Sequence, residues 1–243
     1  MKSEQDNLST SGTRTVKEGY NRRKFLSALG LGTAGAALLT SCGHNDFYDE
    51  FRNNNNNKGT TIDFKDDIGI LNYAYALEQL EAAFYTEVVA KSSAVFSASQ
   101  NAFLNDIKLH EIAHREFFKK ALGSNAIGSL EVDFSSVNFT SKDSVLATAK
   151  AFEDLGVAAY NGAGYKITTE AYLVIAGQIV SVEARHAAWI RDQISNGSFS
   201  DLNSLTALGA DNSKGLDAAL PPSKVLPIAA TFIKTKIDVK NAF

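Results

Sequence analysis

One pattern of residues occurs twice in the middle of this chain, and it restricts how the chain can fold. Each copy has a Glu-x6-Tyr segment followed, some thirty residues later, by a Glu-x2-His segment. The copies are offset by 75 positions in the first segment and by 72 in the second. Residues three, four and seven apart share one face of a helix, so each segment predicts a helix with its polar residues aligned. The residues are Glu78, Tyr85, Glu111 and His114 in one copy, and Glu153, Tyr160, Glu183 and His186 in the other.

Four stretches of the chain have apolar residues at helical spacing. All three prolines lie at residue 221 or later, so no proline interrupts these stretches. Gly123 is expected to end the second helix, a capping box at Thr140 and Asp143 to open the third, and the Asn-Gly-Ala-Gly run 161–164 to break it. The sequence predicts helices over residues 66–91, 100–122, 140–160 and 168–195, and a short helix after residue 220.

The connections between these helices predict an all-α fold. The first and third connections are short, whereas residues 123–140 form a long one. A four-helix bundle with a long crossover between helices two and three has this order of connections.

The four repeated glutamates lie in apolar stripes. Glu78, for example, shares its helix face with Leu71 and Ala74, and Glu111 shares its face with Leu104. An unpaired charge buried there would cost several kcal/mol, and four carboxylates together would repel one another. Two divalent cations would neutralise them. The predicted metal ligands are Glu78, Glu111, His114, Glu153, Glu183 and His186.

Glu81 is an alternative ligand on the first helix because it too has apolar neighbours. The repeat favours Glu78, which has a tyrosine seven positions later as Glu153 does, whereas the position that matches Glu81 is Gly156. Glu81 is kept as the fallback.

The residues from His110 to His114 read HExxH, the helical signature of zinc metalloproteases. No third histidine follows at the spacing of the extended motif, and the second copy has Val182 where the first has His110. The zinc protease is therefore a minor alternative, and His110 is expected at the edge of its helix or behind a ligand.

Tyr85 and Tyr160 each lie two turns from their glutamate, about 10.5 Å along the helix axis. One interpretation is core packing with a satisfied hydroxyl group. The other is a redox-active or hydrogen-bonding tyrosine behind the metal ligands.

The first 42 residues read as an export signal. Arg22 and Arg23 precede an apolar run and resemble the twin-arginine motif, and the run ends at Cys42 in a sequence that resembles a lipoprotein lipobox. We expect a signal peptide over 1–42, lipidation of Cys42, an Asn-rich polar linker over 43–61 and a folded domain over 62–243. The expected location is periplasmic or anchored to a bacterial membrane by lipid.

Composition excludes some classes of protein. The net charge is −3, and the acidic excess lies after residue 42, so nucleic acid is not an expected partner. With a single cysteine, the chain cannot form an internal disulfide or a cysteine-rich zinc site.

The segment LEQLEAAFY at 77–85 and the two Glu-x2-His segments resemble the ferritin-like di-metal carboxylate superfamily. Within it, the chain looks like exported ferritin-like proteins that include desiccation-related proteins. The resemblance implies a di-iron or di-manganese centre bridged by Glu111 and Glu183. It also implies redox chemistry on oxygen, peroxide or Fe(II) as small-molecule or metal-ion substrates. A non-catalytic structural or stress-protective lipoprotein is the alternative function, and the sequence leaves a homodimer open.

Overall fold

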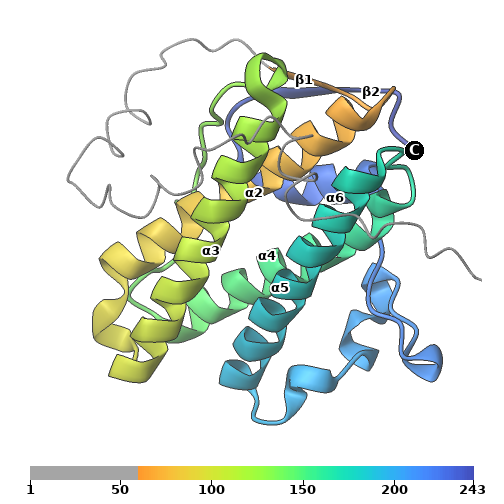
Figure 1. Cartoon of the computed structure of the whole chain (residues 1–243). Helices are drawn as coiled ribbons and strands as arrows, with labels where there is room; N and C mark the ends of the chain where they lie inside the picture. The colour runs from red at the N-terminus through yellow and green to blue at the C-terminus, as the bar shows by residue number, and fades with distance from the viewer. Residues whose placement is uncertain (1–59) are drawn as a thin grey trace, which may run out of the picture. The chain divides into compact units, whose positions relative to one another are not determined.

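The structure, a computed structural model, describes residues 60–243. Four long helices form two pairs, and the expected all-α four-helix bundle is confirmed (Figure 1). The first two pack together, as do the last two, and the long crossover 123–141 joins the pairs. The expected signal peptide, Cys42 and most of the linker lie outside the described residues. The long helices are α2 (Asp67–Lys91), α3 (Ala98–Leu122), α4 (Lys142–Gly164) and α5 (Glu170–Ile194).

Local side-chain contacts determine where α3 begins and ends. At its start, the backbone N–H of Gln100 donates to Ser97 Oγ at 3.2 Å, and the N–H of Ser97 donates to Gln100 Oε1 at 3.1 Å. This reciprocal capping box satisfies two backbone donors that have no partner inside the helix. Gly123 ends the helix as expected, with a positive φ of 54°.

The expected capping box at Thr140 was wrong. Helix α4 begins at Lys142, and Ser141 caps it by accepting the N–H of Ser144 at 3.3 Å. Serine is as good a cap as threonine, so the sequence offered two adjacent choices that local preference alone does not separate.

The expected break at residues 161–164 was also wrong, because α4 continues to Gly164. Asn161 donates from Nδ2 to the carbonyl of Ala218 at 2.8 Å. A Cβ atom on Gly162 would lie 1.9 Å from the carbonyl oxygen of Leu220. These residues therefore let the tail cross the helix closely, and the cost of glycine inside a helix is offset by that contact.

Two buried amide side chains of α2 hold the crossover in place. Asn72 donates from Nδ2 to the carbonyl of Asn125 at 2.9 Å and accepts the N–H of Ile127 at 2.7 Å. Gln79 accepts the N–H of Leu130 at 2.9 Å. Because the crossover covers it, α2 is buried on nearly every side.

A buried ion pair joins α4 to α5. Arg191 donates from Nε to Asp154 Oδ1 at 2.8 Å and from Nη2 to Asp154 Oδ2 at 3.1 Å. Its remaining nitrogen binds the carbonyl of Asp201 and the hydroxyl of Ser204 in the following loop. Bidentate geometry of this kind compensates the desolvation of both groups.

The tail contains the expected short helix and a feature that the sequence did not predict. Helix α6 spans Pro222–Ala229, and strand β2 (Ile237–Lys240) pairs in parallel with β1 (Thr60–Asp63) beside the start of α2. Because β1 begins at Thr60, the last two residues of the expected linker belong to a strand.

None of the described helices is both long and apolar enough to cross a membrane. Short 3-10 helices span Ser93–Val95, Gly123–Asn125, Ser198–Ser200, Asn203–Leu208, Asn212–Lys214 and Ala230–Phe232.

We expect Gly162→Ala to destabilise the protein by about 1–3 kcal/mol, because the new methyl group meets the backbone at Leu220. The matched control is Gly177→Ala in α5, where a Cβ atom meets nothing within 4 Å. That change should stabilise the helix by up to about 1 kcal/mol. Urea unfolding of both variants measures the two effects, and equal changes would contradict this role for Gly162.

Candidate metal centre

The six predicted ligands converge at the centre of the bundle. Every long helix contributes a glutamate, and all four of these glutamates are completely buried. The residues form two groups, and in each group one potential ligand atom per residue lies within 4.8 Å of the others. Glu111 and Glu183 belong to both groups. The first group is Glu78, Glu111, His114 and Glu183, and the second is Glu111, Glu153, Glu183 and His186.

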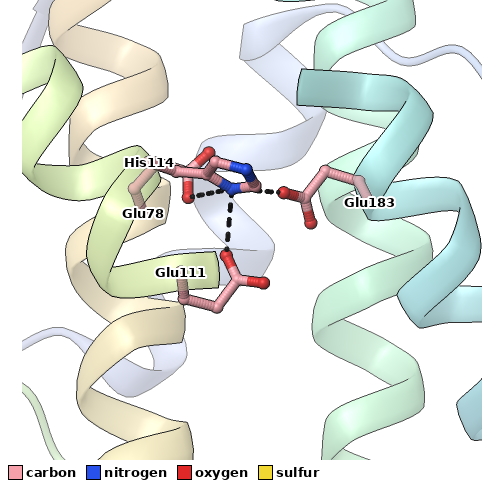
Figure 2. Close-up of side chains that lie close together, drawn as sticks. All are labelled: Glu78, Glu111, His114 and Glu183. Atoms are coloured by element: carbon pink, nitrogen blue, oxygen red, sulfur yellow. Dashed lines mark ion pairs between the residues drawn. The ribbon is translucent and has the colours of Figure 1, made fainter. Parts of the chain in front are cut away.

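In the first group, three carboxylates surround one imidazole nitrogen (Figure 2). His114 Nδ1 lies 2.8 Å from Glu183 Oε1, 3.5 Å from Glu78 Oε2 and 3.6 Å from Glu111 Oε2. The carboxylates come from three different helices, so this arrangement depends on the packing of the whole bundle and not on one local motif.

The second group has the same arrangement around His186. Its Nδ1 lies 2.8 Å from Glu111 Oε1, 3.5 Å from Glu153 Oε2 and 3.7 Å from Glu183 Oε2. Glu111 and Glu183 therefore each direct one oxygen toward His114 and the other toward His186. Two carboxylates arranged in this way are suited to bridge two ions.

The two tyrosines of the repeat cross between the helix pairs. Tyr85 of α2 donates its hydroxyl hydrogen to Glu153 Oε1 at 2.5 Å, and Tyr160 of α4 donates to Glu78 Oε1. Burial, followed by the charge of the glutamate it contacts, raises the pKa of each tyrosine well above its ordinary value, which keeps the hydroxyl protonated. Each tyrosine thus holds one carboxylate oxygen of Glu153 or Glu78 and leaves the other oxygen directed at the cluster.

The cluster carries strongly perturbed acids. Burial raises the pKa of Glu78 and Glu111, and it raises the pKa of Glu153 to about 7. Burial also acts to raise the pKa of Glu183, but contacts with the two histidines lower it to about 2. Without a cation, the cluster must therefore hold protons at neutral pH to limit its negative charge.

The pKa values of the two histidines are determined by the carboxylates around them more than by burial. Burial by itself would lower the pKa of His114 and His186, but the carboxylates around each ring raise it well above the ordinary value. Each ring is thus surrounded by negative charge that favours a positive charge at its Nδ1.

The donor atoms fit a metal better than they fit one another. Eight nitrogen and oxygen atoms of the six residues are buried and make no hydrogen bond of normal geometry among the described residues, although Nδ1 of each histidine lies 2.8 Å from one glutamate oxygen. Buried polar atoms are rarely left in this state. Carboxylate oxygens and imidazole nitrogens are also ligands that iron and manganese accept. The buried acidic and histidine cluster could therefore bind metal.

Glu81 lies outside both groups although it is buried. It faces Gly156, where a Cβ atom would lie 3.1 Å from Glu81 Oε1. Burial, together with the charges of Glu183 and Glu111, raises the pKa of Glu81 well above its ordinary value. A neutral Glu81 adds no negative charge to the cluster, and the glycine provides the space that its side chain occupies.

His110 lies behind His186, one of the predicted ligands, which agrees with one of the two expectations for it. Its Nδ1 is 2.9 Å from His186 Nε2, and the two rings stack with 5.2 Å between their centroids. His110 belongs to neither group, so the pair of histidines in the HExxH motif does not come together as a zinc site. The contact joins two helices. The sequence could therefore suggest that His110 lies behind a ligand, but spacing along the chain could not identify His186 as its partner.

We expect the metal-free protein to lose stability as the pH rises from about 5 to about 8. In this range the raised pKa values of Glu153 and of both histidines mean that the folded state binds more protons than the unfolded state. The free energy of unfolding then falls with increasing pH. Glu183 acts in the opposite sense only below its ordinary value of 4.5, outside this range. Calorimetry of chelator-treated protein measures the trend, and a Tm that rises with pH would contradict it.

Comparison with known proteins agrees with this geometry. The sequence model of the ferritin-like domain matches residues 66–196, which include all four long helices up to the end of α5. No curated protein matches the chain. Since the matched segment covers more than half of the 243 residues, this chain belongs to the ferritin-like domain family.

Proposed function

We propose that the chain is an exported ferritin-like protein that holds two iron or two manganese ions and uses them for redox chemistry on oxygen, peroxide or Fe(II). The observation that carries this proposal is the sharing of Glu111 and Glu183 between two four-residue groups. One ion would need one group of ligands, whereas two groups with two common carboxylates are suited to a dinuclear centre.

In this proposal each of the six residues has a role. Glu78 and His114 would hold one ion, Glu153 and His186 would hold the other, and Glu111 and Glu183 would bridge them. Two divalent cations carry a charge of +4 and balance four carboxylates, so the cluster would no longer need extra protons. Iron or manganese bound here would supply the change in oxidation state that redox chemistry requires.

The surrounding residues keep these ligands in position. The hydroxyl groups of Tyr85 and Tyr160 fix one oxygen of Glu153 and one of Glu78. His110 contacts the ring nitrogen of His186 that faces away from the cluster, which sets the orientation and tautomer of that ring. We assign both tyrosines and His110 to positioning of the ligands.

Metal analysis tests the proposal directly. We expect close to two equivalents of iron or manganese per chain after reconstitution, and a loss of about half or more of the metal in Glu111→Gln, because the change removes a shared charged ligand. The matched control is Glu116→Gln on the same helix, where the side chain is 44% exposed and belongs to neither group. Unchanged metal content in Glu111→Gln would contradict the ligand assignment.

Assays of the loaded protein then separate the functions. Turnover of Fe(II) or peroxide supports the redox function, whereas two bound ions without turnover would support the stress-protective lipoprotein instead.

Export and anchoring are tested in cells. Replacement of both Arg22 and Arg23 by lysine should stop export, because the twin-arginine route requires the arginine pair. Cys42→Ser should leave the exported protein in the soluble fraction, because the lipid has no attachment site. Cell fractionation measures both effects, and a Cys42→Ser protein that stays in the membrane fraction would refute the anchor.

A further inference from the structure

A small apolar cavity, part of which is open to solvent, lies between the long helices near the start of α2. Figure 1 shows this end of the bundle, where β1 and β2 lie beside α2. Its volume is about 30 Å³, room for two or three spheres of the size of a water molecule at about 10–15 Å³ each. All four long helices contribute to its wall. A space of this size suits a molecule of two or three heavy atoms.

The cavity adjoins the first of the two metal groups. Among its lining residues, Leu77 directly precedes Glu78, and Phe118 follows His114 by one helical turn. Tyr160 also lines the cavity, and its hydroxyl group donates to Glu78. The side chain of Tyr160 therefore connects the wall of the cavity to the Glu78–His114 side of the cluster.

The internal repeat allows the cavity wall to be compared with the opposite end of the bundle. Each residue of the wall on a long helix is matched with the residue 75 or 72 positions away in the other copy. At Ile70, Tyr73 and Phe118 the cavity wall has the larger side chain, whereas at four other positions the buried residue at the opposite end is larger. Leu77, Ala159, Ala163 and Ala176 line the cavity, where the other copy has Phe152, Phe84, Val88 and Leu104.

The wall offers few hydrogen bonds to an occupant. The hydroxyl group of Tyr160 is already bound to Glu78. Tyr73 provides a buried hydroxyl group that has no partner among residues 60–243. A polar molecule that lost its water here would lose hydrogen bonds at about 2 kcal/mol or more each, whereas an apolar cavity readily binds an apolar gas.

We propose that this cavity binds dioxygen, as a small apolar gas, and delivers it past Tyr160 to the ion held by Glu78 and His114. This inference rests on the proposed redox function and identifies dioxygen as the oxidant. Fe(II) needs ligands that this wall lacks, and hydrogen peroxide would find few hydrogen-bond partners beyond the hydroxyl group of Tyr73, so we expect both to enter by another route.

Xenon tests the site in the metal-free protein. We expect xenon to bind in the cavity of the wild type, seen in crystals under xenon pressure or by a shift of the ¹²⁹Xe resonance. Ala163→Val and Ala176→Leu give the cavity the residues of the opposite end and should abolish this binding. Ala151→Leu, at an exposed position of α4, is the matched control and should leave it unchanged.

Oxidation kinetics test delivery. In protein loaded with two Fe(II) ions, the pair would supply the two electrons that dioxygen, together with two protons, needs to become hydrogen peroxide. We expect both filled variants to slow this reaction about tenfold. With hydrogen peroxide as the oxidant, two electrons and two protons yield two molecules of water. That rate, the iron content and the Tm should stay near those of the control.

Absence of xenon from the wild type, or filled variants that still react with dioxygen at the wild-type rate, would overturn the inference. These outcomes leave the iron content unaffected. A wild type that binds no iron would instead overturn the proposed function and the delivery of dioxygen, while bound xenon would still identify the cavity as a gas site.

Discussion

The burial of four carboxylates in one place is the constraint on which the rest of this structure depends. Two other buried acids have partners of their own: Asp154 is paired with Arg191, and Asp67 accepts hydrogen bonds from the backbone just before α5. Glu153 directly precedes Asp154, but within residues 60–243 the histidine of its group is its only cationic partner. The buried charges of these two neighbouring acids are therefore compensated in different ways. Asp154 is paired with a guanidinium group, whereas Glu153 requires protons or metal.

The repeat in the sequence identified the helices and the residues that converge, because the 3.6-residue period of a helix converts spacing into a shared face. It could not identify contacts between helices. Spacing placed each tyrosine two turns from the glutamate on its own helix, whereas Tyr85 and Tyr160 bind the glutamates of the opposite helix. Such contacts depend on the relative translation of two packed helices, and a single sequence does not contain that quantity.

The wrong predictions about the fold also arose because contacts between distant segments cannot be predicted from local sequence. Local rules place glycine at helix ends, but Gly162 lies inside α4 because a distant segment passes over it. The pairing of β1 with β2 joins residues more than 170 positions apart. The pattern of residues within each strand does not predict which segment it pairs with. Conversely, Gly123 ended α3 as expected since its signal is entirely local.

The centre is nearly symmetric in its ligands but not in its surroundings. His110 supports His186, whereas the matching position beside His114 is Val182. Glu81 faces Gly156 on one side of the repeat only. Two ions held by equivalent atoms would therefore have different neighbours, and such differences tune the properties of a metal.

The division of the ligands between two helix pairs also has a consequence for assembly. The α2–α3 pair supplies Glu78, Glu111 and His114, and the α4–α5 pair supplies the other three ligands. Neither pair of helices alone contains a complete group, so tight binding of metal at this cluster would follow the docking of the two pairs. Metal occupancy would then report that the chain has reached its native topology, and a misfolded chain would remain empty.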